Sequence, residues 1–290
     1  MTKAAPLDPR PIGVFDSGLG GLTVLRSLID LVPNESLIYF GDTGRFPYGP
    51  KPAEEVREHA LEISDLLVER GVKMLVVACN SAASAALEIL KERYEIPVIG
   101  VVSPGVRAAA KVTASRRVGV IGTVGTITSG AYQRAAEASG LDLTCQACPG
   151  FVEFVEAGDV DSDQVFVLAE RLLDPVRSAD VDTLILGCTH YPLLARTIGK
   201  VMGHDVTLIS SADETAFEVM GLLNPDSKLD STNDTTKHTA FVGSRSARGD
   251  LHQPRGSHTF ITSGDTATFM ELGARFLGPE VADVEAHKWS

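Results

Sequence analysis

The sequence predicts an α/β protein built from two similar lobes, each with a mainly parallel, doubly wound sheet. Short apolar runs alternate with helix-length amphipathic segments along most of the chain, which is typical of parallel sheets covered by helices. Residues at expected strand ends also recur in register: 63 positions separate Asp16 from Cys79, and 65 separate Thr123 from Cys188. We therefore expect two pseudo-symmetric lobes with an active cleft between the carboxyl ends of their sheets.

Each expected strand is a short apolar run followed by a longer segment of helical periodicity. In the first half, strands are expected over residues 12–15, 36–40, 74–78 and 97–101, with helices over 20–31, 52–70 and 81–94. The second half repeats the alternation, with strands over 117–121, 143–145, 183–186 and 206–209 and helices over 129–139, 162–177 and 211–223. A strand over 258–261 and a helix over 265–277 follow, and Gly278-Pro279 ends that helix.

The domain division follows from this alternation. Residues 1–102 and 211–290 form the expected first lobe, which carries Cys79, and residues 103–210 form the expected second lobe, which carries Cys188. Residues 224–257 are rich in Ser, Thr, Asp, Asn and Gly without periodicity, and we expect a mobile excursion there.

Composition limits the class of protein. The 290 residues are 44% hydrophobic, enough for substantial cores, and carry a formal charge of −12. This charge disfavours direct nucleic-acid binding and acidic membranes. No segment reaches the ~18 apolar residues of a membrane helix, and residues 1–11 lack a signal-peptide core, so we expect a cytoplasmic protein. Its four cysteines do not make a secreted disulfide framework, and we expect free thiols.

Two cysteines occupy matching positions at expected strand ends. Cys79 stands between an apolar run and Asn-Ser, and Cys188 stands between a second apolar run and Thr-His. A helix N-terminus favours thiolate, so we expect it to lower the pKa of such a cysteine and let it give or take a proton. Either residue alone would be typical of a buried core position. Because each half supplies one, the pair predicts an opposed acid and base.

A glycine-rich turn over residues 13–21 invites comparison with a dinucleotide-binding fold, with Asp42 at the end of the next strand as the ribose ligand. The spacing disagrees, because Thr23 stands where the third glycine of that fingerprint belongs. No lysine has the setting expected for pyridoxal phosphate, and no glycine-lysine phosphate loop is present. We therefore expect no cofactor.

Cys145 and Cys148 form a Cys-x-x-Cys pair beside an expected strand. Such a pair is redox-active in some proteins and half of a zinc site in others, but a structural zinc site needs a second close ligand pair, which the sequence lacks. We expect no metal site, and a thiol oxidoreductase remains the alternative function for this pair.

Four motifs occur in order along the chain: FDSGLGG over residues 15–21, GDT with PYG within 41–49, ACNSA over 78–82 and GCTHYPL over 187–193. With them the chain resembles the glutamate racemases of the aspartate/glutamate racemase superfamily, over residues 12 to about 223. The resemblance implies cofactor-independent inversion at the α-carbon of glutamate. One thiolate removes the proton from one face, and the other cysteine protonates the opposite face.

The resemblance also implies residue roles. Cys79 and Cys188 each serve one enantiomer, Asp16 assists Cys79, His190 assists Cys188, and Glu156 is an acidic position near the second thiol. The residues alone leave open that Asp16 caps the glycine turn and that His190 bonds only to backbone. Ser81 keeps the hydroxyl of the family's usual threonine. The implied substrate contacts are Asp16, Ser17, Tyr48, Gly49, Asn80, Ser81, Thr189 and His190, with Thr123 and Thr126 as plausible additions from their turn.

Several possibilities stay open. An aspartate racemase or another racemase of the superfamily is the alternative enzyme, because one methylene is worth only about 1–3 kcal/mol of discrimination. The resemblance implies a role in supplying D-glutamate for peptidoglycan synthesis, and it suggests a homodimer. Some glutamate racemases inhibit DNA gyrase, so gyrase binding is a possible additional role.

Overall fold

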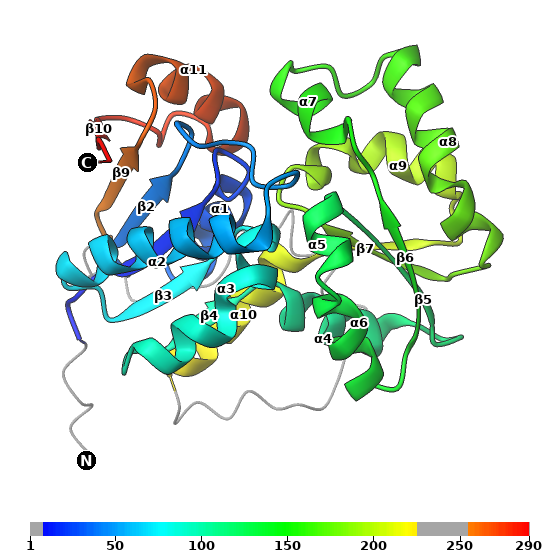
Figure 1. Ribbon diagram of the computed structural model, residues 1–290, viewed down its shortest axis with the longest axis horizontal. Coiled ribbons are helices and arrows are strands. Elements are labelled where there is room, and N and C mark those ends of the chain that lie inside the picture. The colour runs from blue at the N-terminus through cyan, green and yellow to red at the C-terminus, as the bar shows by residue number, and fades with distance from the viewer. Residues whose placement is uncertain (1–7, 225–254, 290) are drawn as a thin grey trace.

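The computed structural model describes residues 8–224 and 255–289. Figure 1 shows two sheets side by side, each flanked by helices. Their strand orders are β10-β9-β2-β1-β3-β4 and β6-β5-β7-β8, and all strand pairs of the described residues are parallel. The α/β class with two mainly parallel, doubly wound lobes is thus confirmed. The predicted excursion over residues 224–257 lies almost wholly outside the described residues.

The first sheet combines strands from both ends of the chain. Its strands are β1 (Ile12–Asp16), β2 (Leu37–Gly41), β3 (Met74–Val77), β4 (Val98–Gly100), β9 (His258–Thr262) and β10 (Val284–Ala286). β1 lies between β2 and β3, and all residues of these three strands are buried, as expected for a parallel sheet covered on both faces. Asp16 pairs with Gly41 in register, so the strand ends that carry the glycine turn and the following loop meet at one edge.

Helices cover this sheet because each has one apolar side. In α1, for example, Leu22, Leu25 and Leu28 recur at helical spacing and are all buried. α1 packs against α10 and α11, whereas α2 packs against α3. The bounds are α1 (Leu22–Leu31), α2 (Ala53–Glu69), α3 (Asn80–Arg93), α10 (Ser211–Leu223) and α11 (Thr266–Leu277).

The second sheet is built from one continuous part of the chain. Its strands are β5 (Arg117–Gly122), β6 (Asp142–Ala147), β7 (Thr183–Gly187) and β8 (Thr207–Ser210). Gly122 pairs with Gly187 in register, so the residues after both strands emerge at the same edge. The surrounding helices are α4 (Val102–Val112), α5 (Val124–Thr128), α6 (Ala131–Ala138), α7 (Phe151–Glu156), α8 (Asp163–Ser178), the 3-10 helix η1 (Tyr191–Leu194) and α9 (Ala195–Met202).

The structure contains elements that the sequence patterns did not predict, namely α4, α5, α7, η1, α9 and β10. α4 includes Pro104 and Gly105, residues of weak helix propensity, and it forms where it packs against α10, α6 and β7. The helix expected over 129–139 is α6, which begins only after Gly130, a residue with a left-handed φ of 73° that separates it from α5. The strand expected over 143–145 extends further at both ends, as β6.

The sheets use residues 12–100 with 258–286 and residues 117–210, respectively. α10 lies beside both α1 and α4 and so connects the two parts of the molecule. The boundaries at residues 102 and 211 remain a prediction. None of the helices within the described residues combines the length and apolar character that crossing a membrane requires.

Candidate active site

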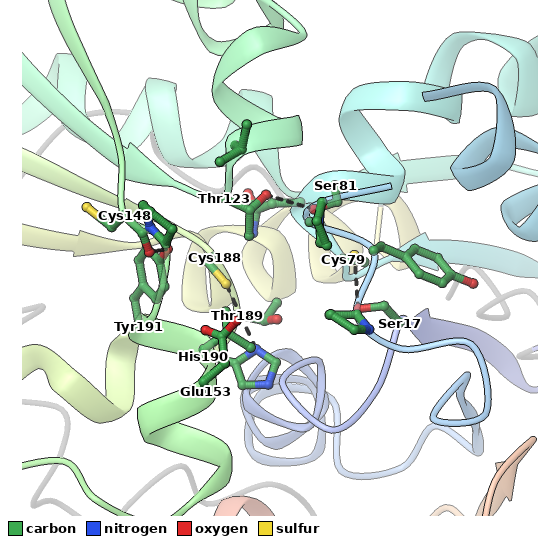
Figure 2. A pocket seen from close by; sticks show the side chains of 18 of the residues that line it. Ser17, Cys79, Ser81, Thr123, Cys148, Glu153, Cys188, Thr189, His190 and Tyr191 are labelled. Carbon is green, nitrogen blue, oxygen red and sulfur yellow. Dashed lines mark hydrogen bonds between the residues drawn. The ribbon is translucent and has the colours of Figure 1, made fainter. Parts of the chain in front are cut away.

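A pocket lies where the carboxyl edges of the two sheets face each other, and both predicted cysteines line it. Cys79 follows β3, and Cys188 follows β7. Figure 2 shows Cys79 with Ser17 on first-sheet segments and Cys188 with His190 on the segment after β7. The other predicted residues in the lining are Ser17, Tyr48, Gly49, Asn80, Ser81, Thr123, Thr189 and His190. Asp16 and Glu156 lie outside the lining, but each bonds to a residue within it.

Cys79 is the N-cap of α3. Its Sγ accepts a hydrogen bond from the Ala82 N–H at 3.4 Å and contacts the Ser17 hydroxyl at 3.6 Å. Burial raises the pKa of Cys79 to about 12, the charge of Asp16 raises it as well, and the hydrogen bonds with Ala82 and Ser17 offset only part of this. The expectation that the helix start lowers this pKa is therefore wrong for Cys79, because the cost of burying a thiolate outweighs the helix N–H groups.

Cys188 belongs to a chain of three polar side chains. Its Sγ lies 3.9 Å from Nδ1 of His190, and Nε2 of that ring lies 2.6 Å from the Glu156 carboxylate. Burial lowers the pKa of His190, but the hydrogen bonds with Cys188 and Glu156 and the charges of Cys188 and Asp16 raise it to about 10 overall. His190 is therefore an imidazolium at neutral pH and donates toward both neighbours.

Asp16 connects the two sheets at the edge of the pocket. It is fully buried, its Oδ1 accepts from the Gly18 N–H at 2.8 Å, and its Oδ2 accepts from the Thr189 hydroxyl at 3.1 Å. Burial raises the pKa of Asp16, while the His190 charge and these hydrogen bonds lower it by less. Asp16 thus acts electrostatically on Cys79 and bonds directly to the segment of Cys188. Its role as the helper of Cys79 stays a prediction.

The lining is rich in neutral hydrogen-bond donors. Asn80 is buried, its Oδ1 accepts from the Tyr132 hydroxyl at 2.7 Å, and its Nδ2 has no partner. The Ser81 hydroxyl lies 3.0 Å from that of Thr123, the N-cap of α5, and 3.3 Å from that of Thr126. No lysine or arginine lies among the lining residues of this described pocket. Apart from the charged His190, the groups that can bind carboxylates here are therefore neutral donors and helix starts.

Tyr48 and Gly49 reach the pocket from the loop between β2 and α2. The Gly49 carbonyl accepts from the Gly125 N–H at 2.9 Å, and a Cβ on Gly49 would lie 2.9 Å from the Thr123 Cβ. Glycine thus allows a close approach of the two lobes. The Tyr48 hydroxyl donates to Asp42, which is fully buried. Asp42, the residue considered as a ribose ligand in a dinucleotide-binding fold, is therefore an internal hydrogen-bond acceptor.

The sequence patterns missed several lining residues, among them Phe46, Cys148, Glu153 and Tyr191. Cys148 directly follows β6, so it is a third cysteine at a strand end. The sequence patterns predict that this strand ends at residue 145 and therefore do not place Cys148 there. Burial and then the charge of Cys188 raise the pKa of Cys148 to about 12. Cys145 lies on β6 outside the lining, and both are free thiols. The described residues contain no cluster of three or more potential metal ligands.

Comparisons with known proteins agree with this architecture. The Asp/Glu/Hydantoin racemase family model matches residues 12–219. The glutamate racemase of Parafrankia sp. (strain EAN1pec) is 51% identical over 94% of this chain and 93% of that protein. The crystal structure of a glutamate racemase from Bacillus anthracis superposes with a TM-score of 0.82 at 41% identity, covering 97% of each chain. One from Francisella tularensis, in complex with D-glutamate, has a TM-score of 0.82 at 32% identity, covering 97% of this chain and 98% of that one.

The fold and these matches define an amino-acid racemase, which is an isomerase. The chain belongs to the Asp/Glu/Hydantoin racemase family, among the glutamate racemases.

Proposed function

We propose that the protein interconverts L- and D-glutamate without a cofactor, by exchanging protons through two cysteines. The observation that carries this proposal is that Cys79 and Cys188, from different sheets, line one pocket. Inversion at a carbon requires a base at one face and an acid at the other. The D-glutamate named in the Francisella tularensis complex supports the choice of substrate.

In one direction, the Cys188 thiolate takes the α-proton and the Cys79 thiol gives its own proton to the opposite face of the same carbon. In the reverse reaction Cys79 is the base and Cys188 is the acid. In either direction the α-carbon loses one proton and gains one. The positively charged His190 lies beside Cys188, and burial keeps Cys79 in its thiol form. In the first direction Cys79 is therefore the acid, and Cys188 is the base at the opposite face.

Substrate binding in this proposal relies on the neutral donors of the lining. The unpartnered Nδ2 of Asn80 and the hydroxyls of Ser81, Thr123 and Thr189 bind the carboxylates, since a buried donor without a partner is costly unless a ligand accepts from it. Ser17, Tyr48 and Gly49 complete the wall on the side of Cys79. Fixed donors also stabilise the negative charge that develops when the α-proton leaves.

The proposal has a biological setting that follows from the family resemblance. We infer that the reaction supplies D-glutamate for peptidoglycan synthesis in the cytoplasm and that the enzyme is a homodimer. Gyrase inhibition remains a prediction from the same resemblance, and a DNA supercoiling assay with the purified protein tests it. An aspartate racemase is the alternative enzyme, and kcat/KM values for the two amino acids distinguish them.

Proton NMR in deuterated water tests the reaction class, because racemisation by proton exchange replaces the α-proton of L-glutamate with deuterium. We expect that signal to disappear without any added cofactor. Cys79→Ala and Cys188→Ala each lower the rate by at least about a hundredfold, the usual contribution of a general acid or base.

Cys145→Ala is the matched control, since this thiol lies outside the pocket lining, and we expect it to retain wild-type activity. Substantial racemisation by either active-site variant would refute the two-thiol mechanism.

A further inference from the structure

The last described residue of the chain, Trp289, contacts the loop that forms part of the pocket. Its indole N–H donates to Oδ1 of Asp42 at 3.0 Å. The guanidinium carbon of Arg45 lies 3.9 Å from the centroid of the same indole ring. His287 and Phe40 pack against this ring, with centroid distances of 4.4 and 5.5 Å. His287 and Phe40 therefore fix the position of the indole ring, and the ring in turn contacts two loop residues, Asp42 and Arg45.

Asp42 gathers four side-chain donors around one fully buried carboxylate. Besides Trp289, they are Arg45 at 2.7 Å, Ser263 at 2.5 Å and the Tyr48 hydroxyl. A buried carboxylate is stable only when its oxygens are fully hydrogen-bonded, and removing one donor from such a group weakens the whole arrangement. The position of each donor therefore depends on the others.

Tyr48 connects this cluster to the substrate. Its hydroxyl bonds to Asp42 behind the wall, while the residue itself lines the pocket beside Gly49. Cys79 and Cys188, in contrast, are positioned by the ends of β3 and β7. A disturbance at Asp42 thus reaches the wall of the pocket and leaves the two sulfur atoms in place.

We propose that Trp289 is a positioning residue for the substrate pocket, holding Asp42 and Arg45 so that Asp42 fixes Tyr48 and Gly49 in the lining. This inference rests on the proposed function, because the pocket it shapes is the one assigned to glutamate. Trp289 touches no reacting atom. Its effect passes through Asp42 to the loop over residues 42–50.

Trp289→Phe tests the inference, since phenylalanine keeps a ring under Arg45 but lacks the N–H donor. We expect KM for glutamate to rise about three- to tenfold, the effect of one lost hydrogen bond, with kcat within about twofold of wild type. Hydrogen exchange of the amides over residues 42–50 should be faster than in wild type, a readout that needs no substrate.

The matched control is Glu285→Gln. Glu285 fastens the same C-terminal segment by an ion pair with Arg70 at 2.8 Å but does not contact Asp42. We expect this variant to keep wild-type KM and loop exchange. In a Tyr48→Phe background, which already lacks the bond to Asp42, Trp289→Phe should add little further increase in KM.

The inference is overturned if Trp289→Phe leaves KM or loop exchange unchanged, if Glu285→Gln changes them equally, or if the effects of Trp289→Phe and Tyr48→Phe simply add. A wild-type protein that does not racemise glutamate refutes the proposed function instead, and the exchange measurement then still decides whether Trp289 orders the loop.

Discussion

The charge of His190 is set by neighbours from distant parts of the chain. Burial alone would make this ring neutral, yet the Glu156 carboxylate at 2.6 Å and the nearby Cys188 and Asp16 reverse the effect. Figure 2 shows the ring beside Cys188 and Thr189 at the pocket. A single residue thus carries the positive charge that the lining otherwise lacks.

This charge predicts a pH dependence of stability. The pKa of His190 is raised from 6.5 to about 10 on folding, so its stabilising contribution is complete below pH 6.5 and is lost as pH rises through about 10. The free energy of unfolding, measured with urea, should contain a term from His190 that falls by up to about 1.4 kcal/mol for each pH unit between pH 6.5 and about 10. His190→Asn should lack the dependence. An unchanged pH profile in that variant would show that the ring is not charged in the folded protein.

At the scale of elements, the carboxyl ends of parallel strands place the chemistry. A predicted site residue stands at the end of each of four strands. β1 ends at Asp16, β5 ends one residue before Thr123, and β7 ends one residue before Cys188. β3 ends two residues before Cys79. These positions were predictable because a short apolar run marks its own end. Helices such as α4 and α7 were not predictable, since tertiary contacts rather than local periodicity stabilise them.

α10 offers a test of local propensity at this scale. Gly221 lies in its last turn, and a Cβ there would meet nothing within 4 Å. Gly221→Ala should therefore raise the free energy of unfolding by about 0.5–1 kcal/mol, because glycine is costly inside a helix. Chemical denaturation measures the change. A destabilised variant would mean that α10 needs glycine for its packing against α1 and α4.

The whole molecule is organised around contacts between its two sheets. Asp16 bonds to Thr189, Ser81 to Thr123, and Asn80 to Tyr132, so each wall of the pocket is fixed by residues of the other lobe. Pocket geometry thus depends on how closely the lobes approach.

Gly49→Ala tests this dependence. The new Cβ would lie 2.9 Å from the Thr123 Cβ, too close for an unaltered structure, so the lobes must separate slightly. We expect kcat/KM to fall at least about tenfold, because small misplacements of reacting groups are costly. Gly221→Ala is the control for glycine replacement and should racemise normally. Wild-type kinetics for Gly49→Ala would show that the lobes tolerate a wider spacing.

The sequence by itself determined the alternation of strands and helices along most of the chain, the two cysteines at strand ends and the family, because these depend on local apolar patterns and short motifs. Only the tertiary structure decided the raised pKa of Cys79, the pairing of His190 with Glu156 across 34 positions and that of Trp289 with Asp42 across 247. Burial and long-range contact set these properties, and both arise only when distant segments pack together.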